Sequence, residues 1–283
     1  MGTVTEIWRY AVKSMGGERL QDTTVGPGGV PGDRAWAVRD EVRGGIRGGK
    51  KLPGLMQCKA AYPNPPAETG SSPAQITLPD GSVVDTGATD VNERLSAALD
   101  HAVSLWPLLP ADALDHYRRG APDQEDFEQE LRDMFGRQPD EPLPDLSLFP
   151  PELMEFESPP GTYFDAFPIL LLSNTSLATL RAASDAVIDV RRFRPNFLLD
   201  LPDTEGYPEQ DWHDRRLQLG EAVLQVTVEC PRCVMTTHGF DDLPRDPGIM
   251  RSLVQSAGGS LGVYATVEQP GTVKVGDALT LLD

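Results

Sequence analysis

The chain has 283 residues, of which 39% are hydrophobic and 24% charged, and its net charge is −18 at pH 7. This composition is that of an ordinary globular protein with one large domain or two smaller ones. The negative charge argues against general binding to nucleic acid or to anionic membranes, which requires a basic surface. The few cysteines cannot form a disulfide framework, and no stretch approaches the roughly 18 apolar residues of a membrane span. We therefore expect a cytoplasmic protein.

The N-terminal third predicts short strands separated by Gly and Pro turns. The expected strands, rich in β-branched and aromatic residues, cover 3–12, 35–40, 74–80 and 82–87. A helix is expected over 90–100. The glycine-rich stretch 26–34 lacks the Gly-Lys-Ser/Thr sequence of a phosphate-binding loop, so we interpret it as a turn.

Residues 111–160 differ in character from the stretches on either side. An acidic amphipathic helix is expected over 123–136, and a Pro-rich stretch follows it. We interpret 111–160 as a connector or insertion whose negative charge forms a solvated face, with a docking surface as the alternative. A further role open to this segment is to shape the mouth of a pocket.

The C-terminal part predicts a second folded unit made mainly of strands. The expected strands cover 167–173, 193–200, 217–229, 234–237 and 262–271, and a closing hairpin around a Gly-Asp turn covers 271–282. Helices are expected over 174–184, after a Ser/Asn start signal, and over 246–259, before a terminal glycine. The fold class predicted is mainly β with some helices (α+β), in two units.

Two of the three cysteines, Cys230 and Cys233, lie in "VTVECPRCVMTTHG" beside Arg232. A structural zinc site needs four ligands, and the histidines are scattered singly. A thioredoxin-like dithiol belongs at a helix N-terminus, whereas 234–237 predicts a strand. Two interpretations remain open: two buried cysteines without a chemical role, or one thiolate, favoured by Arg232, that binds a soft metal whose other ligands come from a cofactor.

The few basic residues gather in distinctive stretches. Lys13, Arg34, the run "RRFR" at 191–194 and Arg232 all lie in such stretches of this acidic chain. Arginine forks and lysine bind phosphate and carboxylate groups through charge-assisted hydrogen bonds. The pattern hints at a small anionic ligand that is held locally.

In order along the chain, these stretches resemble the MOSC proteins, named for the C-terminal domain of the molybdenum cofactor sulfurases. The segments that carry the resemblance are "YAVKSMGGERL", "GDRAWAVRD", "YFDAFPILLLSNTSLATL", "RFRPNFLL", "CPRC" and "QPGTVKVGDALTLL". Ala11 stands where the family's Pro-x-Lys-Ser segment has proline. The resemblance is to members that join an N-terminal MOSC β-barrel domain to the MOSC domain, such as the mitochondrial amidoxime-reducing component and its bacterial relatives.

The resemblance implies an architecture and a cofactor. An N-terminal β-barrel-like domain would cover 1–110, the insertion 111–160, and a MOSC β-barrel domain 161–283. The cofactor implied is the molybdenum cofactor (Mo-molybdopterin), independent of pyridoxal phosphate. Cys233 carries over as the metal ligand and catalytic residue, adding a third soft sulfur to the two of the dithiolene.

The resemblance also implies a set of residues that hold the cofactor. The cofactor-binding residues carried over are Lys13, Ser14, Arg34, Asp165, Arg194, Asn196, Arg232 and Tyr264. Cations among them would neutralise the pterin phosphate. We expect these side chains to converge with Cys233 in a cleft between the two units.

The function implied is the reduction of small N-hydroxylated substrates, such as amidoximes and hydroxylamines. The sequence carries no iron–sulfur or haem motif, so a separate ferredoxin- or cytochrome-type donor protein with its reductase would supply electrons. One alternative stays open: a module that binds the cofactor, or carries sulfur as a Cys233 persulfide, without turning over a substrate. Another is a barrel that has lost the cofactor, in which the basic residues would not converge.

Overall fold

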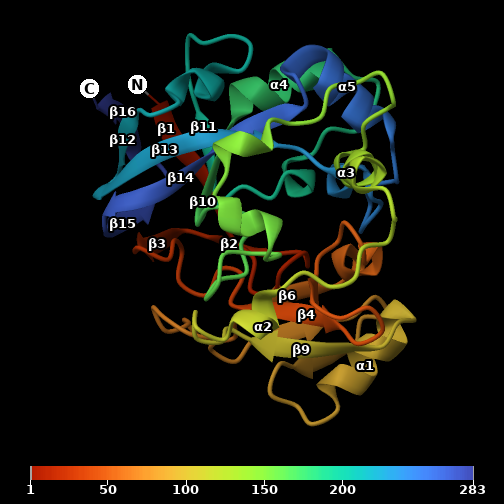
Figure 1. The fold of residues 1–283 in the computed structure, drawn as a ribbon. Helices are drawn as coiled ribbons and strands as arrows, with labels where there is room; N and C mark the ends of the chain where they lie inside the picture. The colour runs from red at the N-terminus through yellow and green to blue at the C-terminus, as the bar shows by residue number, and fades with distance from the viewer. Residues whose placement is uncertain (1, 283) are drawn as a thin grey trace.

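The computed structural model describes residues 2–282, in which strands and a few helices form two units, one above the other in Figure 1. The fold class predicted from the sequence, mainly β with some helices, is confirmed. None of the helices in these residues combines the length and the apolar character that a membrane span requires. All three cysteines are free thiols.

The larger unit is a closed β-barrel. Its strands follow the order β11-β10-β14-β13-β12-β16-β1, and β1 pairs again with β11, which closes the barrel. The strands are β1 (Gly2–Arg9), β10 (Ile169–Ser173), β11 (Phe197–Asp200), β12 (Arg216–Leu219), β13 (Ala222–Pro231), β14 (Ser260–Gln269) and β16 (Ala278–Leu282). Alternate side chains such as Leu171, Phe197 and Val226 fill the interior. Closure leaves few unpaired strand edges to protect.

The first strands of the chain lie with this barrel. Besides β1, β3 (Asp22–Val25) pairs with β15 (Gly271–Lys274), and β2 (Glu18–Leu20) extends the sheet next to β1. The first strands of the range 1–110 therefore join the barrel formed mainly by the range 161–283. This arrangement brings segments from both ends of the chain to the junction of the two units.

The closing hairpin predicted over 271–282 is wrong. β15 pairs with β3, while β16 pairs with β12 and β1, so the two strands belong to different sheets. The turn between them does form: the Lys274 amide donates to Asp277 Oδ2 over 2.8 Å, and the Asp277 amide donates to the Lys274 carbonyl. Long-range pairing with the N-terminal strands overrides the local hairpin pattern.

The smaller unit contains two three-stranded sheets and a helix. The sheets have the orders β5-β4-β9 and β6-β7-β8. Their elements are β4 (Trp36–Asp40), β5 (Ile46–Arg47), η1 (Pro53–Gln57), β6 (Lys59–Ala61), β7 (Gln75–Thr77), β8 (Val83–Asp85), α1 (Val91–Leu99) and β9 (Val103–Pro107). Val38, Leu55, Ile76 and Leu95 are buried together between them. The helix predicted over 90–100 is confirmed.

Two helices cover one side of the barrel. They are α4 (Asn174–Ala182) and α5 (Gly248–Ala257), and short turns η4 (Val190–Arg192) and η5 (Pro208–Trp212) lie nearby. Ser173 caps α4 by accepting a hydrogen bond from the Ser176 amide, and Gly258 ends α5 in the left-handed conformation. Both helices were predicted from these signals and are confirmed.

Residues 111–160, called here the connecting segment, run along the side of both units (Figure 1). The segment contains α2 (Leu114–Tyr117), α3 (Phe127–Phe135), η2 (Leu146–Leu148) and η3 (Pro151–Met154). The predicted acidic helix is confirmed as α3, which Asp126 caps and Gly136 ends. Arg137 fixes its end to the barrel, donating to the carbonyls of Phe135 and Gly259.

The strand predicted over 234–237 is wrong, because these residues form the 3-10 turn η6 (Val234–Thr237). The hydroxyl of Thr236 donates to the Cys233 carbonyl, and that of Thr237 donates to the Val234 carbonyl. Such local side-chain to backbone bonds compete with strand pairing and override the β-propensity of the sequence. The chain therefore turns sharply just after Cys233.

Candidate functional site

Two adjoining cavities lie between the two units, and the Cys233 side chain lies on the wall that they share. The inner cavity is lined by all nine residues singled out from the sequence, namely Lys13, Ser14, Arg34, Asp165, Arg194, Asn196, Arg232, Cys233 and Tyr264. The outer cavity is lined by the connecting segment and by the loop that contains Lys50. The convergence expected from the sequence is found, although it leaves the role of each residue open.

The backbone of the inner cavity is strained at three residues. Ser14, Arg34 and Arg194 have φ angles of 69°, 48° and 55°, in the left-handed region that favours glycine. Each such residue costs on the order of 1 kcal/mol or more, so the surrounding structure must hold it in place. Ser14 Oγ accepts a hydrogen bond from the Gly49 amide over 2.8 Å, and the Arg34 amide donates to the Tyr10 carbonyl over 2.6 Å. Strain of this kind collects at functional sites.

Two arginines lie against the ring of Tyr10 at this cavity. The guanidinium carbons of Arg194 and Arg34 are 4.2 and 5.1 Å from the ring centroid. Arg34 pairs with Asp33, and Arg194 donates from Nη1 to the Met15 carbonyl. Arg194 Nη2 is buried and has no hydrogen-bond partner within the described part of the chain.

The unpartnered Nη2 of Arg194 indicates a missing acceptor. An unpaired buried donor is costly, and nearly all such groups in proteins find a partner. Burial also lowers the pKa of Arg194 to about 10, although Tyr10 opposes the shift. An anionic group in the inner cavity would accept the free hydrogen bond and compensate the charge.

Lys13 and Asp165 form a fixed ion pair at the wall. Lys13 Nζ donates to Asp165 Oδ1 over 2.8 Å, to the Tyr163 carbonyl over 2.8 Å and to Ser158 Oγ over 3.2 Å. Burial lowers the pKa of Lys13, and Asp165 opposes this shift. Burial would raise the pKa of Asp165, but Lys13 and other cations hold it far below its usual range. All three ammonium protons are thus committed, and Lys13 orients Asp165.

Asn196 and Arg232 line the inner cavity while their polar groups bind the backbone. Asn196 Oδ1 accepts from the Leu170 amide over 3.1 Å. Arg232 Nη1 donates to the Phe193 carbonyl over 2.8 Å, and Nε donates to the Leu261 carbonyl over 2.8 Å. Both side chains therefore tie neighbouring segments together and shape the cavity.

The surroundings of Cys233 include a cation that the sequence did not indicate. Burial raises the pKa of its thiol, and among the nearby cations Lys50 opposes the shift more than Arg232 does. Arg232 was expected to favour the thiolate and does lower the pKa of Cys233, although less than Lys50. Cys233 is partly exposed to the cavities, whereas Cys230 and Cys58 are buried, and burial raises the pKa of both.

The described side chains of this cavity do not provide a complete set of metal ligands. Within residues 2–282, no three His, Cys, Asp or Glu side chains come together in an arrangement that could bind a metal ion. A metal at Cys233 would therefore take most of its ligands from outside the chain. A soft thiolate with a non-protein ligand set suits a metal that arrives as part of an organic cofactor.

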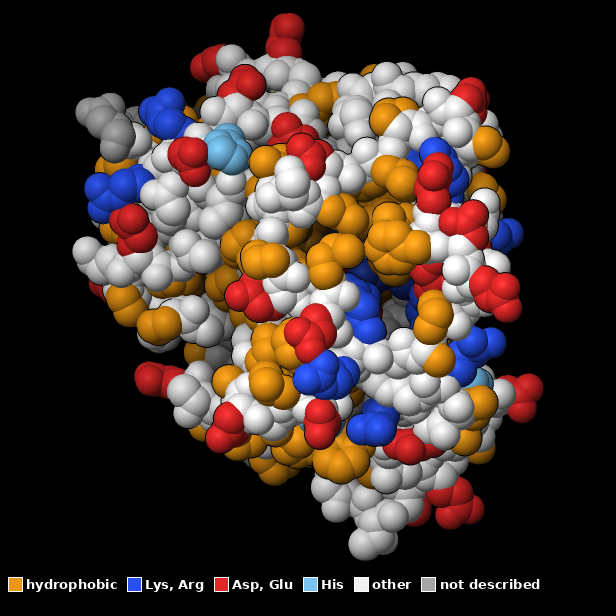
Figure 2. All heavy atoms as spheres, in the orientation of Figure 1, with side chains coloured by type: hydrophobic (Ala, Val, Ile, Leu, Met, Phe, Trp, Pro, Cys, Tyr) orange, Lys and Arg blue, Asp and Glu red, His pale blue; other side chains and the backbone are white. Residues whose placement is uncertain are grey.

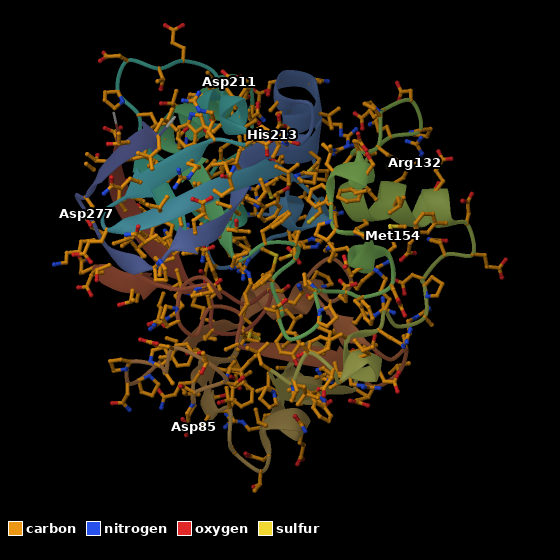
Figure 3. The ribbon with its side chains drawn as sticks, turned by 60° about the vertical axis from the view of Figure 1, so that its left-hand side comes forward. Asp85, Arg132, Met154, Asp211, His213 and Asp277 are labelled. Atoms are coloured by element: carbon orange, nitrogen blue, oxygen red, sulfur yellow. The ribbon has the colours of Figure 1, made fainter. Side chains whose placement is uncertain are left out.

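The outer cavity combines apolar walls with charged side chains. Its apolar side comes from the connecting segment, with Phe127, Met134, Phe135, Leu146, Phe149 and Met154 among the lining residues. Figure 2 shows hydrophobic side chains next to basic ones in a hollow where the two units meet. In Figure 3, the labelled Arg132 and Met154 of the connecting segment lie on the side opposite Asp277 at the far end of the barrel.

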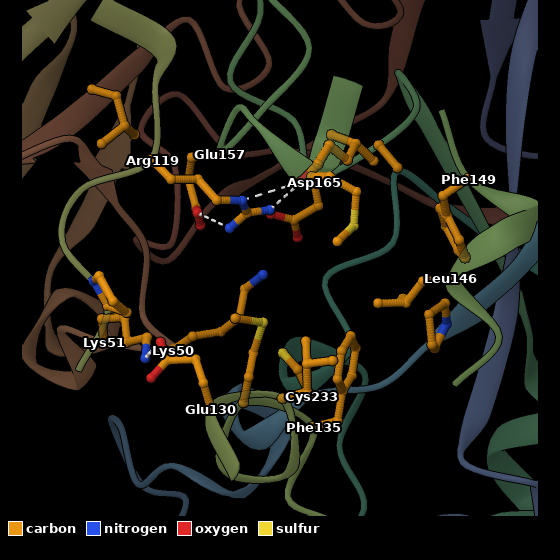
Figure 4. Close-up of a pocket in the computed structure, with 18 of the residues that line it drawn as sticks. Lys50, Lys51, Arg119, Glu130, Phe135, Leu146, Phe149, Glu157, Asp165 and Cys233 are labelled. Atoms are coloured by element: carbon orange, nitrogen blue, oxygen red, sulfur yellow. Dashed lines mark hydrogen bonds and ion pairs between the residues drawn. The ribbon is translucent and has the colours of Figure 1, made fainter. Parts of the chain in front are cut away.

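Lys50 and Lys51 were not predicted from the sequence. Both line the outer cavity, and Figure 4 shows Lys50 extending into it from the wall opposite Arg119. One signal was present: the chain has only five lysines, and three of them, Lys13 included, lie at the two cavities. The small number of lysines in this acidic chain was therefore a signal that could have pointed to these two.

The described residues thus combine a closed barrel with a cavity lined by both an unpartnered guanidinium and a partly exposed thiol. Two family models match the chain: the MOSC N-terminal beta barrel domain over residues 1–106 and the MOSC domain over residues 159–280. The chain belongs to the MOSC-domain proteins that carry this N-terminal β-barrel domain.

Similar proteins include mitochondrial amidoxime-reducing components. The chain is 32% identical to human mitochondrial amidoxime-reducing component 1 over 135 residues, which cover 42% of this chain and 38% of the human protein. It is 33% identical to the Xenopus laevis protein over 128 residues, covering 41% and 36%. The chain thus aligns with less than half the length of these relatives.

Among solved structures, the chain is similar to the YUAD protein from Bacillus subtilis. The match has a TM-score of 0.46 and 13% sequence identity, and it covers 99% of this chain and 94% of that protein. A shorter match, to YiiM from Geobacillus stearothermophilus, has a TM-score of 0.32 and 20% identity, and it covers 41% and 55% of the two chains.

Proposed function

We propose that the protein is a molybdenum-cofactor-dependent oxidoreductase that reduces N-hydroxylated compounds with electrons from a separate donor protein. The observation that carries the proposal is the unpartnered Arg194 Nη2 in the same cavity as the Cys233 thiol. The names of the relatives, amidoxime-reducing components, support the class of substrate.

The residues of the inner cavity fit such a cofactor. Arg194 and Arg34 would take a phosphate group, because a guanidinium donates to phosphate oxygens with two N–H groups at once. Cys233 would supply a soft sulfur to the metal. When bound, the cofactor supplies a metal centre that exchanges an oxygen atom with the substrate and takes up two electrons.

The remaining residues would orient and shield the reacting groups. The Lys13–Asp165 pair presents a fixed carboxylate at the wall that both cavities share. The ring of Tyr264 packs 5.7 Å from that of Phe167 and 6.5 Å from that of Phe149, which forms an aromatic wall near Cys233. Such a wall would exclude water from the reaction, as closed active sites do.

The outer cavity would admit the substrate. It reaches Cys233 and is lined mainly by apolar side chains of the connecting segment. A role for this segment in shaping the pocket mouth was left open by the sequence, and the lining residues support it. Reducing a hydroxylamine to an amine and water consumes two electrons and two protons.

Electrons would come from a ferredoxin- or cytochrome-type protein and its reductase. The sequence contains no iron–sulfur or haem motif, and its three cysteines are too few to ligate a four-thiolate cluster. We therefore expect no turnover with NADH alone and turnover once a donor and its reductase are added. Direct NADH-driven reduction by the isolated chain would refute a separate donor.

The test is to produce the chain in a host that makes the cofactor, and to measure molybdenum by mass spectrometry and pterin by the fluorescence of its oxidised form. Benzamidoxime reduction with an artificial reductant then tests the reaction. A folded protein without metal or pterin would overturn the proposal. A protein that contains both but reduces no N-hydroxylated compound would instead be a cofactor-binding or sulfur-carrying module.

A further inference from the structure

Most charged side chains of the outer cavity pair with one another. Arg119 Nη1 lies 2.5 Å from Glu157 Oε2, and its Nε and Nη2 donate to the Leu153 carbonyl. Lys51 Nζ lies 2.7 Å from a carboxylate oxygen of Asp123 and also contacts Glu130. These pairs leave little net charge to attract a ligand.

Lys50 is the exception. Arg47 is flanked by Asp123 at 3.7 Å, and the Asp165 carboxylate accepts from Lys13. Within residues 2–282, the Lys50 ammonium makes no hydrogen bond and no ion pair, although the nearby Asp165 and Glu157 carboxylates raise its pKa despite burial. The cavity therefore presents one cation whose hydrogen bonds are free.

The position of Lys50 is set by the loop before it. The Gly49 amide donates to Ser14 Oγ over 2.8 Å, and its carbonyl lies 3.0 Å from His238 Nε2. A side-chain carbon on Gly48 would lie 2.9 Å from Ser14 Oγ, and one on Gly49 would lie 3.0 Å from the Met235 methyl group. Close contacts on both sides fix this loop, so the point from which Lys50 extends is rigid.

The surroundings of Lys50 favour an anionic ligand with an apolar body. In Figure 4 its side chain reaches into the cavity between Glu157 and Asp165 on one side and Cys233 on the other. Phenylalanine, leucine and methionine side chains of the connecting segment form the opposite apolar wall. A cation beside such a wall is poorly solvated, and a ligand carboxylate would compensate it.

We propose that Lys50 makes the outer cavity specific for N-hydroxylated compounds whose apolar body carries a carboxylate, an inference that rests on the proposed function. The carboxylate binds the Lys50 ammonium while the apolar body lies against the connecting segment. A neutral compound leaves the hydrogen bonds of the Lys50 ammonium unmet. The attraction is local, because exposed charges of this acidic chain are screened beyond about 8 Å at physiological salt.

The test compares 4-carboxybenzamidoxime with 4-carbamoylbenzamidoxime, which is of similar size but neutral. The protein should reduce the carboxylate with a kcat/KM about tenfold higher or more, the usual scale for a hydrogen bond to a charged group. Lys50→Met and Lys50→Gln should abolish the preference, and Lys50→Arg should keep it. Lys274→Met removes the same charge from an exposed strand position and serves as the control.

Equilibrium binding without reductant separates this inference from the proposed function. By calorimetry, the wild-type protein should bind the carboxylate about tenfold more tightly than the amide, and Lys50→Met should bind both equally. Lys50-dependent binding without any turnover would sink the proposed reaction and leave this specificity standing. Equal kcat/KM and equal binding for the two compounds in the wild-type protein would overturn the inference, as would loss of molybdenum from Lys50→Met.

Discussion

The inner and outer cavities meet at Cys233 but are built in different ways. The inner cavity is made of polar side chains on strained turns, with Ser14, Arg34 and Arg194 all in the left-handed conformation. Its arginines and asparagine are bonded to the backbone of neighbouring segments. The outer cavity is made mainly of apolar side chains on the connecting segment, which Arg137 and other charged residues attach to the rest of the molecule.

This difference suits the two roles proposed for the cavities, which are to hold the cofactor and to select the substrate. A site that must hold one fixed group benefits from a preorganised wall whose side chains are locked by hydrogen bonds. A site that selects among substrates can be lined by a mobile or variable segment, as binding loops on rigid scaffolds are. We therefore expect changes in the inner cavity to abolish cofactor binding and changes in the outer cavity to alter substrate preference.

The largest expected effect is that of Cys233→Ser. The substitution replaces a soft thiolate by a hydroxyl, so molybdenum and amidoxime reduction should both be lost while circular dichroism stays unchanged. Cys230→Ser should keep the metal and most activity, because Cys230 lines the inner cavity but not the wall that the two cavities share. A stability loss of about 1–3 kcal/mol is expected, because the new hydroxyl would be buried. Equal losses in the two variants would contradict a single-ligand role for Cys233.

The next largest effect is expected from Arg194→Met. The variant keeps an apolar stem against Tyr10 but removes the unpartnered Nη2. Pterin content, measured by fluorescence after oxidation, should fall at least about tenfold, because a charge-assisted hydrogen bond to phosphate is lost. Arg191→Met, which removes a nearby guanidinium paired with Asp189 and Asp242, is the control and should keep the pterin. Normal pterin content in Arg194→Met would show that Nη2 does not bind the cofactor.

The sequence predicted the inner cavity well and the outer cavity poorly, for a physical reason. The residues of the inner cavity stand in ordered motifs, so each could be named before its position was known. Their left-handed backbone could not be predicted, because serine and arginine rarely adopt it without tertiary support. Lys50 belongs to no motif, and only the packing of the connecting segment makes it part of a cavity.

The errors in the fold have the same origin. The stretch 234–237, in which three of the four residues are β-branched, predicted a strand, but two threonine hydroxyls donate back to backbone carbonyls in η6. The turn at Gly276 and Asp277 was predicted correctly, yet its flanking strands pair with β3 and β12 from elsewhere in the chain. Local patterns thus predicted the elements, and contacts distant in sequence decided their partners.

A smaller effect is expected from Arg137→Met, which loosens the outer cavity. The buried Arg137 guanidinium donates to the carbonyls of Phe135, Pro142 and Gly259. Removing it leaves the Phe135 and Pro142 carbonyls without this donor, at a cost of about 1–3 kcal/mol, whereas the Gly259 carbonyl still accepts from the Arg232 amide. We expect faster proteolysis within the connecting segment and a KM raised several-fold, with molybdenum content unchanged.

The control for Arg137→Met is Arg94→Met, which removes a guanidinium bonded to the Val83 carbonyl in the smaller unit, away from both cavities. It should leave KM unchanged. If Arg137→Met lost its molybdenum as well, a change in the outer cavity would also disturb cofactor binding in the inner one. The expected division of roles between the two cavities would then be wrong.

The smallest effect concerns pH and two histidines, one behind each cavity. His116 Nε2 lies 2.6 Å from the hydroxyl of Tyr163, whose carbonyl accepts from Lys13. His238 Nε2 lies 3.0 Å from the Gly49 carbonyl in the loop before Lys50. Burial lowers the pKa of both imidazoles in the folded protein.

Because burial lowers both imidazole pKa values in the folded state, the unfolded chain binds more protons near and below its histidine pKa of about 6.5. The stability they contribute is complete above that value and is lost as the pH falls toward the folded pKa. Urea unfolding at pH 7.0 and 5.5 should show a lower midpoint at pH 5.5, before the carboxylates titrate. His116→Gln and His238→Gln should each reduce this pH dependence. Amide hydrogen exchange at pH 5.5 should rise near Lys13 if His116 is protonated and near Lys50 if His238 is protonated. A midpoint independent of pH in the wild-type protein would show that neither histidine is held neutral.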